Sequence, residues 1–314
     1  MILLMYEPVP EHLTILKEIA GDREIRWATT EEEAKLLIRN AEIVLGNRFF
    51  IQSLPFAEKL RWMQSNSVGV DIILAKKEIL QQKNIILTCA KGVYDTELAE
   101  HTIALLLSLF RSLHLLRDEQ KAHSWQRHRL STLNNSNCLI IGWGSLGKEI
   151  ARLLHAFGAN VAGVRSREED SEENGFTIFG SKNWKNQLPQ TDALIVCLPK
   201  TESTYHFVGK SELEQLPVNA FVVNIGRGGT LDDNAVLRQI QLNKLAGAAL
   251  DVFENEPLPA AHEIWDEPRI LVSPHVGRSL EGPAFKWQSI FEENLRRYLT
   301  GAPMLHVVDY EKGY

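Results

Sequence analysis

The sequence has few cysteines, no long apolar run and no excess of positive charge, and each absence excludes a class of protein. The three cysteines, Cys89, Cys138 and Cys197, are odd in number and far apart, which fits neither a disulfide framework nor a zinc site. No apolar run approaches the roughly 18 residues of a membrane-spanning helix, and the apolar residues 1–5 are too few for a signal peptide. The formal net charge of −6 provides no basic field for nucleic acid or anionic lipid. These features predict a cytoplasmic protein that binds small molecules, with no metal site and no nucleic-acid or membrane partner.

The length and the apolar pattern predict two α/β domains. A chain of 314 residues with 44% hydrophobic content exceeds the size at which a single core stops growing. Short apolar runs alternate with helical patterns, and this alternation is typical of parallel sheets covered by helices on both faces. The expected strands are residues 2–5, 43–45, 61–64, 85–89, 138–141, 161–164, 177–179, 193–198, 221–225, 245–252 and 270–272.

Several other segments carry local signals. Thr30 followed three residues later by Glu33 predicts a capping box. Leucines recur at helical spacing from residue 98 to residue 116 and predict one long helix. A second helix is expected from about residue 284 to 300, followed by a strand over 304–308. The polar segment 123–137, which contains Trp125, is interpreted either as a solvated connection or as an arm that lies on a partner subunit.

A glycine-rich turn predicts a dinucleotide site. It follows the expected strand 138–141 and opens a helix, which is the context that gives a GxGxxG pattern its meaning. The first glycine permits the tight turn, the second lets a pyrophosphate approach the backbone, and the third lets the helix pack on the strand. The phosphates would then bind the free amides of the helix N-terminus. The residues of this turn are Gly142, Trp143, Gly144, Ser145, Leu146 and Gly147.

The next strand bears on the choice of nucleotide. An acidic residue normally follows it and accepts hydrogen bonds from the ribose 2′-hydroxyl, but here the strand is followed by Arg165, Ser166 and Arg167. Guanidinium groups and a hydroxyl bind a 2′-phosphate through charge-assisted hydrogen bonds. NADP is therefore favoured over NAD. The alternative is that the arginines pair with the acids at 168–170 on a solvated loop.

Three polar residues follow successive apolar runs downstream of the glycine turn: Arg227, Glu256 and His275. If the runs are neighbouring parallel strands, these residues meet at the carboxyl edge of the sheet, where ligands bind. Arg227 could orient a substrate carboxylate and stabilise a developing oxyanion. His275 could donate the proton that a reduced carbonyl requires, and Glu256 would favour the imidazolium and hold the ring in one orientation. Singly, each could equally be a turn cation, a loop acid or a capped histidine.

The chain resembles the D-isomer-specific 2-hydroxyacid dehydrogenases from about residue 60 to 308. By this resemblance Arg227 binds substrate, Glu256 is the partner of the histidine and His275 is the proton donor. The motifs that carry the resemblance are Gly142-Trp-Gly-Ser-Leu-Gly147, Leu198-Pro199 with Thr201 and Thr204, Asn224-Ile-Gly-Arg-Gly-Gly229, Ala249-Leu-Asp-Val-Phe-Glu-Asn-Glu-Pro257 and Ser273-Pro-His-Val-Gly277.

The resemblance also implies a layout and further contacts. A Rossmann nucleotide-binding domain, residues 99–283, is inserted in a flavodoxin-like substrate domain, residues 1–98 and 284–314. The loop at Val68 and Gly69 would offer backbone amides to the substrate carboxylate. Beyond the glycine turn and residues 165–167, the expected cofactor contacts are Leu198, Pro199, Thr204, Ile225, Gly226, Asp251 and His275.

The sequence thus predicts an enzyme that reduces a small 2-keto acid to a D-2-hydroxy acid with NADPH, or with NADH, and that forms a homodimer through the nucleotide-binding domain. Many members of the family have aspartate at the position of Arg165. In having arginine there, the chain resembles the NADPH-linked glyoxylate and hydroxypyruvate reductase branch. Two alternatives remain. One is a dehydrogenase of a phosphorylated hydroxy acid, with Arg48 at the phosphate. The other is a nucleotide-sensing regulator similar to the C-terminal-binding co-repressors, which share the fold.

Overall fold

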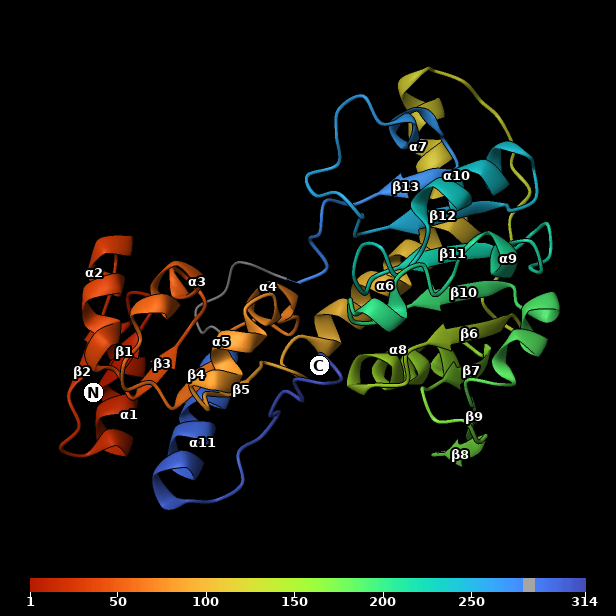
Figure 1. Ribbon diagram of the computed structural model, residues 1–314. Helices are drawn as coiled ribbons and strands as arrows, with labels where there is room; N and C mark the ends of the chain where they lie inside the picture. Colours follow the sequence, from red (N-terminus) through yellow and green to blue (C-terminus); the bar gives the residue numbers. More distant parts are fainter. Residues whose placement is uncertain (279–285) are drawn as a thin grey trace. The chain divides into compact units, whose positions relative to one another are not determined.

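The protein is described by a computed structural model that covers residues 1–278 and 286–314. The chain divides into two compact units (Figure 1): unit 1 comprises residues 1–93 and 281–314, and unit 2 comprises residues 94–280. Unit 2 is therefore inserted in unit 1 along the sequence. The domain boundary expected at residues 283 and 284 lies outside the described residues. Among the described helices, none is long and apolar enough to cross a membrane.

Unit 1 is built on a five-stranded parallel sheet. Its strand order, β2-β1-β3-β4-β5, is that of flavodoxin-like sheets, as expected. The structure confirms the four predicted strands and adds β2, whose side chains are mostly exposed at the edge of the sheet, so that no buried apolar run marks it. The strands are β1 (Ile2–Leu4), β2 (Ile25–Trp27), β3 (Ile43–Leu45), β4 (Trp62–Gln64) and β5 (Ile86–Thr88).

Helices cover this sheet, and local sequence signals explain where several begin and end. In the capping box of α2, the Glu33 N–H donates to the Thr30 hydroxyl and the Thr30 N–H donates to the Glu33 carboxylate, which confirms the prediction. Helix α11 ends at Gly301, which has a φ of 72°; its expected start at residue 284 lies outside the described residues. The helices are α1 (Pro10–Ala20), α2 (Glu31–Leu37), α3 (Phe50–Ser53), α4 (Asp71–Leu74), α5 (Lys77–Gln82) and α11 (Trp287–Thr300), with 3₁₀ turns η1 (Ile38–Asn40) and η2 (Leu54–Phe56).

The strand predicted over residues 304–308 is wrong. This segment makes only an isolated antiparallel bridge between Thr88 and Val307. His306 adopts a left-handed φ of 55°, which interrupts the extended conformation that a ladder needs.

Unit 2 contains an eight-stranded sheet in the order β13-β12-β11-β10-β6-β7-β9-β8, parallel except for β8, which pairs antiparallel with β9. The chain runs outward from β6 through β7 to β9 and then returns to β10 on the other side of β6, which is the Rossmann switch point. All seven predicted strands are confirmed. The strands are β6 (Asn137–Ile141), β7 (Asn160–Val164), β8 (Ser171–Glu173), β9 (Phe176–Phe179), β10 (Ala193–Val196), β11 (Phe221–Asn224), β12 (Gly247–Leu250) and β13 (Ile270–Val272).

The sheet of unit 2 is buried on both faces because successive strand residues point to opposite sides. In β10, Leu194 and Val196 pack into one core, while Ala193 and Ile195 pack into the other. Helices α9 and α10 contribute to the first core and α6 and α8 to the second. The helices and 3₁₀ turns are α6 (Asp95–Phe110), α7 (Leu113–Lys121), α8 (Ser145–Ala156), η3 (Trp184–Gln190), η4 (Glu202–Thr204), α9 (Lys210–Leu213), α10 (Asp233–Gln241) and η5 (Glu263–Asp266).

The prediction of one long helix over residues 98–116 is wrong. Ser112 has a left-handed φ of 51° and separates α6 from α7. The apolar stripe is buried at Leu105 and Leu109 but exposed at Leu113 and Leu116. The helical spacing of the leucines continues across the turn at Ser112, so the spacing alone did not show that the helix ends there.

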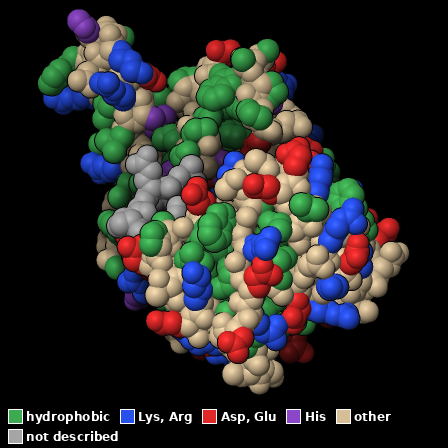
Figure 2. All heavy atoms as spheres, turned by 90° about the vertical axis from the view of Figure 1, so that its left-hand side faces the viewer, with side chains coloured by type: hydrophobic (Ala, Val, Ile, Leu, Met, Phe, Trp, Pro, Cys, Tyr) green, Lys and Arg blue, Asp and Glu red, His purple; other side chains and the backbone are tan. Residues whose placement is uncertain are grey.

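Acidic and basic side chains are interspersed on the face of the molecule drawn in Figure 2. This mixed surface agrees with the small net charge of −6. Interspersed charges screen one another and produce no extended field of one sign on that face.

Candidate active site

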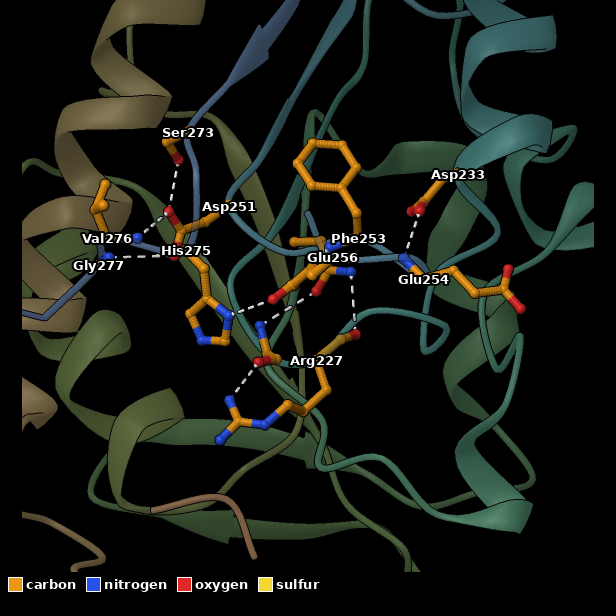
Figure 3. Close-up of polar contacts among 12 residues, drawn as sticks. Arg227, Asp233, Asp251, Phe253, Glu254, Glu256, Ser273, His275, Val276 and Gly277 are labelled. Carbon is orange, nitrogen blue, oxygen red and sulfur yellow. Dashed lines mark hydrogen bonds and ion pairs between the residues drawn. The ribbon is translucent and has the colours of Figure 1, made fainter. Parts of the chain in front are cut away.

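The three polar residues singled out in the sequence follow three adjacent strands. Strands β11, β12 and β13 pair in parallel, with Asn224 opposite Leu250 and Leu250 opposite Val272. Arg227, Glu256 and His275 come after these aligned positions, so all three lie at the carboxyl edge of one sheet. Figure 3 shows the three side chains extending from these strand ends into the same region.

Glu256 and His275 form a hydrogen-bonded pair. His275 Nδ1 lies 2.7 Å from Glu256 Oε2, and the second carboxylate oxygen, Oε1, accepts the backbone N–H of Phe253 at 3.0 Å. The carboxylate is thus fixed at both oxygens and orients the imidazole through Nδ1, which leaves Nε2 for another group. The side chain of His275 is 46% exposed, so a ligand can reach it.

His275 has an unusual backbone conformation that its surroundings hold in place. Its φ is +53°, a left-handed value that costs free energy for a residue with a Cβ. The His275 N–H donates to the carbonyl oxygen of Asp251 at 2.8 Å. The Asp251 carboxylate accepts hydrogen bonds from the Ser273 hydroxyl at 2.7 Å and from the N–H groups of Val276 at 3.1 Å and Gly277 at 3.2 Å. Asp251 therefore binds the turn on both sides of the histidine.

Asp251 is suited to this role because it stays ionised although it is buried. Burial raises the pKa of this carboxyl, but hydrogen bonds from His101, Ser273 and Val276 outweigh the burial and lower the pKa below its usual value. His101 Nε2, from helix α6, lies 3.3 Å from Asp251 Oδ1. The cofactor contact expected of Asp251 stays a prediction, and the structure adds a positioning role.

Arg227 lies on a tight turn that packs against the turn carrying Glu256. Its guanidinium donates to the Gly226 carbonyl oxygen at 2.9 Å, and its own carbonyl oxygen accepts the Thr230 hydroxyl at 2.7 Å. A Cβ on Gly228 would lie 1.7 Å from the carbonyl oxygen of Phe253. Glycine at 228 thus allows the backbones of the two turns to touch, which brings the arginine and the carboxylate to the same edge.

A second buried carboxylate supports the loop before Glu256. Asp233 Oδ2 accepts the N–H of Glu254 at 3.0 Å, whereas Asp233 Oδ1 is buried and has no hydrogen-bond partner in the described part of the chain. Burial, opposed by the Glu254 N–H and reinforced by nearby acids, raises the pKa of Asp233 from 3.8 to about 6. The Glu254 side chain accepts the Tyr205 hydroxyl at 2.7 Å, which lowers the pKa of Glu254.

The glycine-rich turn lies between β6 and α8 and fits a dinucleotide. Gly142 has a φ of +113°, and a Cβ on Gly147 would lie 2.1 Å from the Gly142 carbonyl oxygen, so the protein itself requires these two glycines. A Cβ on Gly144 would meet no protein atom within 4 Å. The open space beside Gly144 is what close approach of a pyrophosphate needs. No side chain caps the first turn of α8, and its N–H groups at Ser145 and Leu146 remain for phosphate oxygens.

The ring of Trp143, within the same turn, faces away from this space. A Cβ on Gly163 would lie 2.0 Å from the indole, so the ring lies flat on β7 and is only 7% exposed. Phe176 packs against it edge to face. The ring of Trp143 thus stabilises the strand that leads to Arg165, and any cofactor contact from this residue would come from its backbone.

Arg165 pairs with an acid, but not with one of those expected. Its guanidinium donates to Glu173 at 2.6 Å, and the same carboxylate binds Lys148 in the first turn of α8. Two of the acids at 168–170 bind elsewhere: Glu168 pairs with Lys182, and Asp170 accepts the Gly180 N–H. Hydrogen bonds from Lys148 and Arg165 lower the pKa of Glu173. The alternative in which Arg165 pairs with the acids at 168–170 is therefore wrong, because its partner is Glu173.

Most of the other expected cofactor residues lie at neighbouring strand ends in unit 2. Leu198, Pro199 and Thr204 follow β10, and Ile225 and Gly226 follow β11. The Thr204 hydroxyl donates to the Pro199 carbonyl oxygen at 2.7 Å and so closes its own turn. A Cβ on Gly226 would lie 2.6 Å from the carbonyl oxygen of Leu198, so these two turns pack directly on one another.

Val68 and Gly69 belong to unit 1 and lie on the loop after β4. Asn47, at the end of β3, holds this loop: its side chain donates to the Ser67 hydroxyl at 3.0 Å and accepts the Asn66 N–H at 3.2 Å. In the described residues, neither the Val68 N–H nor the Gly69 N–H has an acceptor. The binding of a substrate carboxylate by these amides stays a prediction.

Five supporting residues were not assigned a role from the sequence: His101, Lys148, Glu173, Asp233 and Ser273. Each acts through a hydrogen bond or ion pair that depends on tertiary placement, which a one-dimensional pattern does not encode. Only Ser273 carried a signal, as the first residue of the motif that contains His275. Within the described residues, no group of histidine, cysteine, aspartate and glutamate side chains could hold a metal ion.

Comparison with known proteins agrees with this geometry. Residues 103–277 match the family model for the NAD binding domain of D-isomer specific 2-hydroxyacid dehydrogenase. Over 98% of its length the chain is 28% identical to D-3-phosphoglycerate dehydrogenase from Methanocaldococcus jannaschii, of which it spans 59%. It is 29% identical over 87% of its length to glyoxylate/hydroxypyruvate reductase B from Yersinia pestis, of which it covers 86%.

Solved structures show the same fold over nearly the whole chain. A D-isomer specific 2-hydroxyacid dehydrogenase family protein from Aeromonas salmonicida is 30% identical, with a TM-score of 0.85 and 98% of each chain covered. The NADPH-dependent glyoxylate/hydroxypyruvate reductase of Sinorhizobium meliloti, solved with NADP and sulfate, is 24% identical, with a TM-score of 0.85 and 100% and 99% coverage. The family match covers the strand ends that carry Arg227, Glu256 and His275. The chain therefore belongs to the D-isomer-specific 2-hydroxyacid dehydrogenase family of oxidoreductases, and its second unit contains an NAD-binding domain.

Proposed function

We propose that the protein reduces a small 2-keto acid to a D-2-hydroxy acid with NADPH. The observation that carries this proposal is the fixed Glu256–His275 pair at the same edge of the sheet as Arg227 and the glycine turn. When bound, the nicotinamide supplies the hydride. The protein must then orient the keto acid and provide one proton to its oxygen.

The three residues divide this work. Arg227 binds the substrate carboxylate, and its charge stabilises the oxygen as negative charge develops there. The protonated imidazole of His275 donates its Nε2 proton to that oxygen, while Glu256 holds the ring in one orientation through Nδ1. The amides of Val68 and Gly69 are proposed to bind the same carboxylate, and the substrate domain is proposed to comprise the rest of unit 1.

Residues at the end of β7 support the choice of NADPH. Arg165, Ser166 and Arg167 stand where an acid would accept the ribose 2′-hydroxyl of NAD. Arg167 is exposed, and its side chain has no hydrogen-bond or ion-pair partner in the described residues. A relative named glyoxylate/hydroxypyruvate reductase B makes glyoxylate and hydroxypyruvate the first substrates to test.

A substrate panel tests the proposal. Glyoxylate, hydroxypyruvate, pyruvate, a bulkier 2-keto acid and a phosphorylated keto acid are each supplied with NADPH or NADH, and oxidation of the cofactor is followed at 340 nm. We expect turnover of a small keto acid, with kcat/KM higher for NADPH. The His275→Asn variant should lose about 100-fold or more in kcat, which excludes a contaminating reductase. Nucleotide binding without turnover of any keto acid would instead favour the regulatory alternative.

The predicted homodimer has its own test. Residues 123–132 lie outside the helices and strands, and Trp125 within them is 95% exposed. We propose that this arm of the nucleotide-binding domain lies on a second copy of the chain. Sedimentation equilibrium should show that the parent is a dimer and that Trp125→Ala has a higher dissociation constant for the dimer. A monomeric parent would overturn this proposal.

A further inference from the structure

One carboxylate in the nucleotide-binding unit lies where it opposes the proposed choice of cofactor. Glu173 contacts Arg165 at 2.6 Å and also Lys148. Arg165 follows β7, and Lys148 follows directly after Gly147. In this fold the N-terminus of the first helix binds the pyrophosphate and the end of the second strand binds the adenosine ribose, so the two cations come from the elements on either side of the 2′-position.

The position of Glu173 is set by a tight hairpin. Strands β8 and β9 are joined by Asn174 and Gly175, which have φ values of 53° and 80°, as a two-residue turn of the primed type requires. Glu173 and Phe176 pair across this turn. Phe176 packs against Trp143 with ring centroids 5.6 Å apart, so the hairpin is anchored on the glycine-rich turn itself.

We propose that Glu173 is a specificity-determining residue, an internal anion that occupies Arg165 and Lys148 and that a 2′-phosphate must displace. This inference rests on the proposed function. Two cations and one carboxylate leave a net charge of about +1 for a phosphate that carries about −1.5 to −2 at pH 7. The ribose of NAD has a neutral 2′-hydroxyl, which does not need the cations. Glu173 therefore weakens the binding of NADP relative to NAD.

The opposite role, in which Glu173 holds Arg165 ready for the phosphate, predicts the opposite result on substitution. If Glu173 only competes, removing its charge strengthens phosphate binding. If it only positions Arg165, removing its charge frees the side chain of Arg165 and weakens phosphate binding. The exposed position of the Glu173–Lys148–Arg165 cluster, with side-chain exposures of 29%, 44% and 20%, favours competition, because partly solvated pairs are weak and readily exchanged.

The test uses the full-length protein and two adenosine fragments, so it does not depend on turnover. Adenosine 2′,5′-bisphosphate carries the 2′-phosphate and adenosine 5′-monophosphate does not. Isothermal titration calorimetry measures the Kd of each for the parent and for Glu173→Gln. The matched control is Glu172→Gln, an exposed acid on the same strand whose side chain has no hydrogen-bond or ion-pair partner in the described residues.

We expect Glu173→Gln to lower the Kd of the bisphosphate by roughly threefold to tenfold, to leave the Kd of the monophosphate within twofold, and to exceed the effect of the control. In the Lys148→Gln background the gain should shrink, because one of the two competing contacts is already lost. A higher Kd for the bisphosphate, or an equal change for both fragments or both variants, overturns the inference. A parent that binds the fragments as expected but reduces no keto acid refutes the proposed reaction and leaves the role of Glu173 supported.

Discussion

The substitution Asp233→Asn should stabilise the protein at neutral pH. Asp233 is 6% exposed, one of its oxygens accepts the Glu254 N–H, and the other is buried without a partner in the described residues. An asparagine keeps the acceptor for Glu254 through its carbonyl oxygen. Its amide group carries no charge to desolvate.

The size and sign of the effect follow from the raised pKa of Asp233. Below pH 3.8 the carboxyl is neutral in both the folded and the unfolded chain, and it adds no penalty. Between pH 3.8 and about 6 the unfolded chain ionises first, so the free energy of unfolding falls as pH rises. The interval between the two pKa values corresponds to about 3 kcal/mol, and this penalty is complete above about pH 7. The Asp233→Asn variant has no such penalty, because its amide does not ionise.

Urea unfolding followed by tryptophan fluorescence measures this effect, since Trp184 is fully buried in unit 2. The difference in unfolding free energy between Asp233→Asn and the parent should grow from near zero at pH 4 to at most about 3 kcal/mol at pH 7.5. The control Asp266→Asn removes an exposed acid of the same unit and should show no such growth. A difference that is constant with pH, or a variant that is less stable at pH 7.5, would refute the reasoning.

Four further variants test the site. Glu256→Gln weakens the hydrogen bond that orients His275 through Nδ1, so kcat for reduction should fall by about tenfold or more; an unchanged kcat would contradict that role. Replacing both Arg165 and Arg167 with alanine should raise KM for NADPH by about tenfold or more and KM for NADH far less, and an equal rise would indicate a merely solvated loop. Gly144→Ala should change the free energy of unfolding by less than about 1 kcal/mol yet weaken the binding of both NADPH and NADH. Gly147→Ala should instead lower the free energy of unfolding. Urea titrations measure the stability of each variant, and calorimetry measures its nucleotide binding.

Strand positions could be predicted well from the sequence because parallel strands are buried on both faces and appear as continuous apolar runs. The prediction of strands failed where a strand is not buried and therefore contains no continuous apolar run. Strand β2 (Ile25–Trp27) lies at an edge with exposed side chains, and β8 (Ser171–Glu173) is polar throughout. Similarly, leucine spacing continued from α6 into α7, because the left-handed Ser112 between them leaves no trace in a pattern of apolar residues.

The convergence of Arg227, Glu256 and His275 at one sheet edge was predictable for a related reason. Once three strands are parallel and adjacent, their carboxyl ends must coincide, and the order of strands follows from the Rossmann connection rule. Which acidic side chain forms an ion pair with which basic side chain was not predictable. Arg165 pairs with Glu173, eight residues away on β8, rather than with the acids that follow it directly, because the strand order β7-β9-β8 is set by tertiary pairing.

The supports of His275 show how the fold holds an unusual backbone conformation in place. The left-handed backbone of this residue is unfavourable in isolation, and it persists because a buried, ionised Asp251 accepts hydrogen bonds from both sides of the turn. A carboxylate can do this only if its charge is compensated, which the N–H groups, Ser273 and His101 achieve together. Asp251, with a lowered pKa, and Asp233, with a pKa raised to about 6, thus lie under consecutive turns of one sheet edge. The number of hydrogen bonds that each buried carboxylate accepts determines the direction in which its pKa moves from the ordinary value.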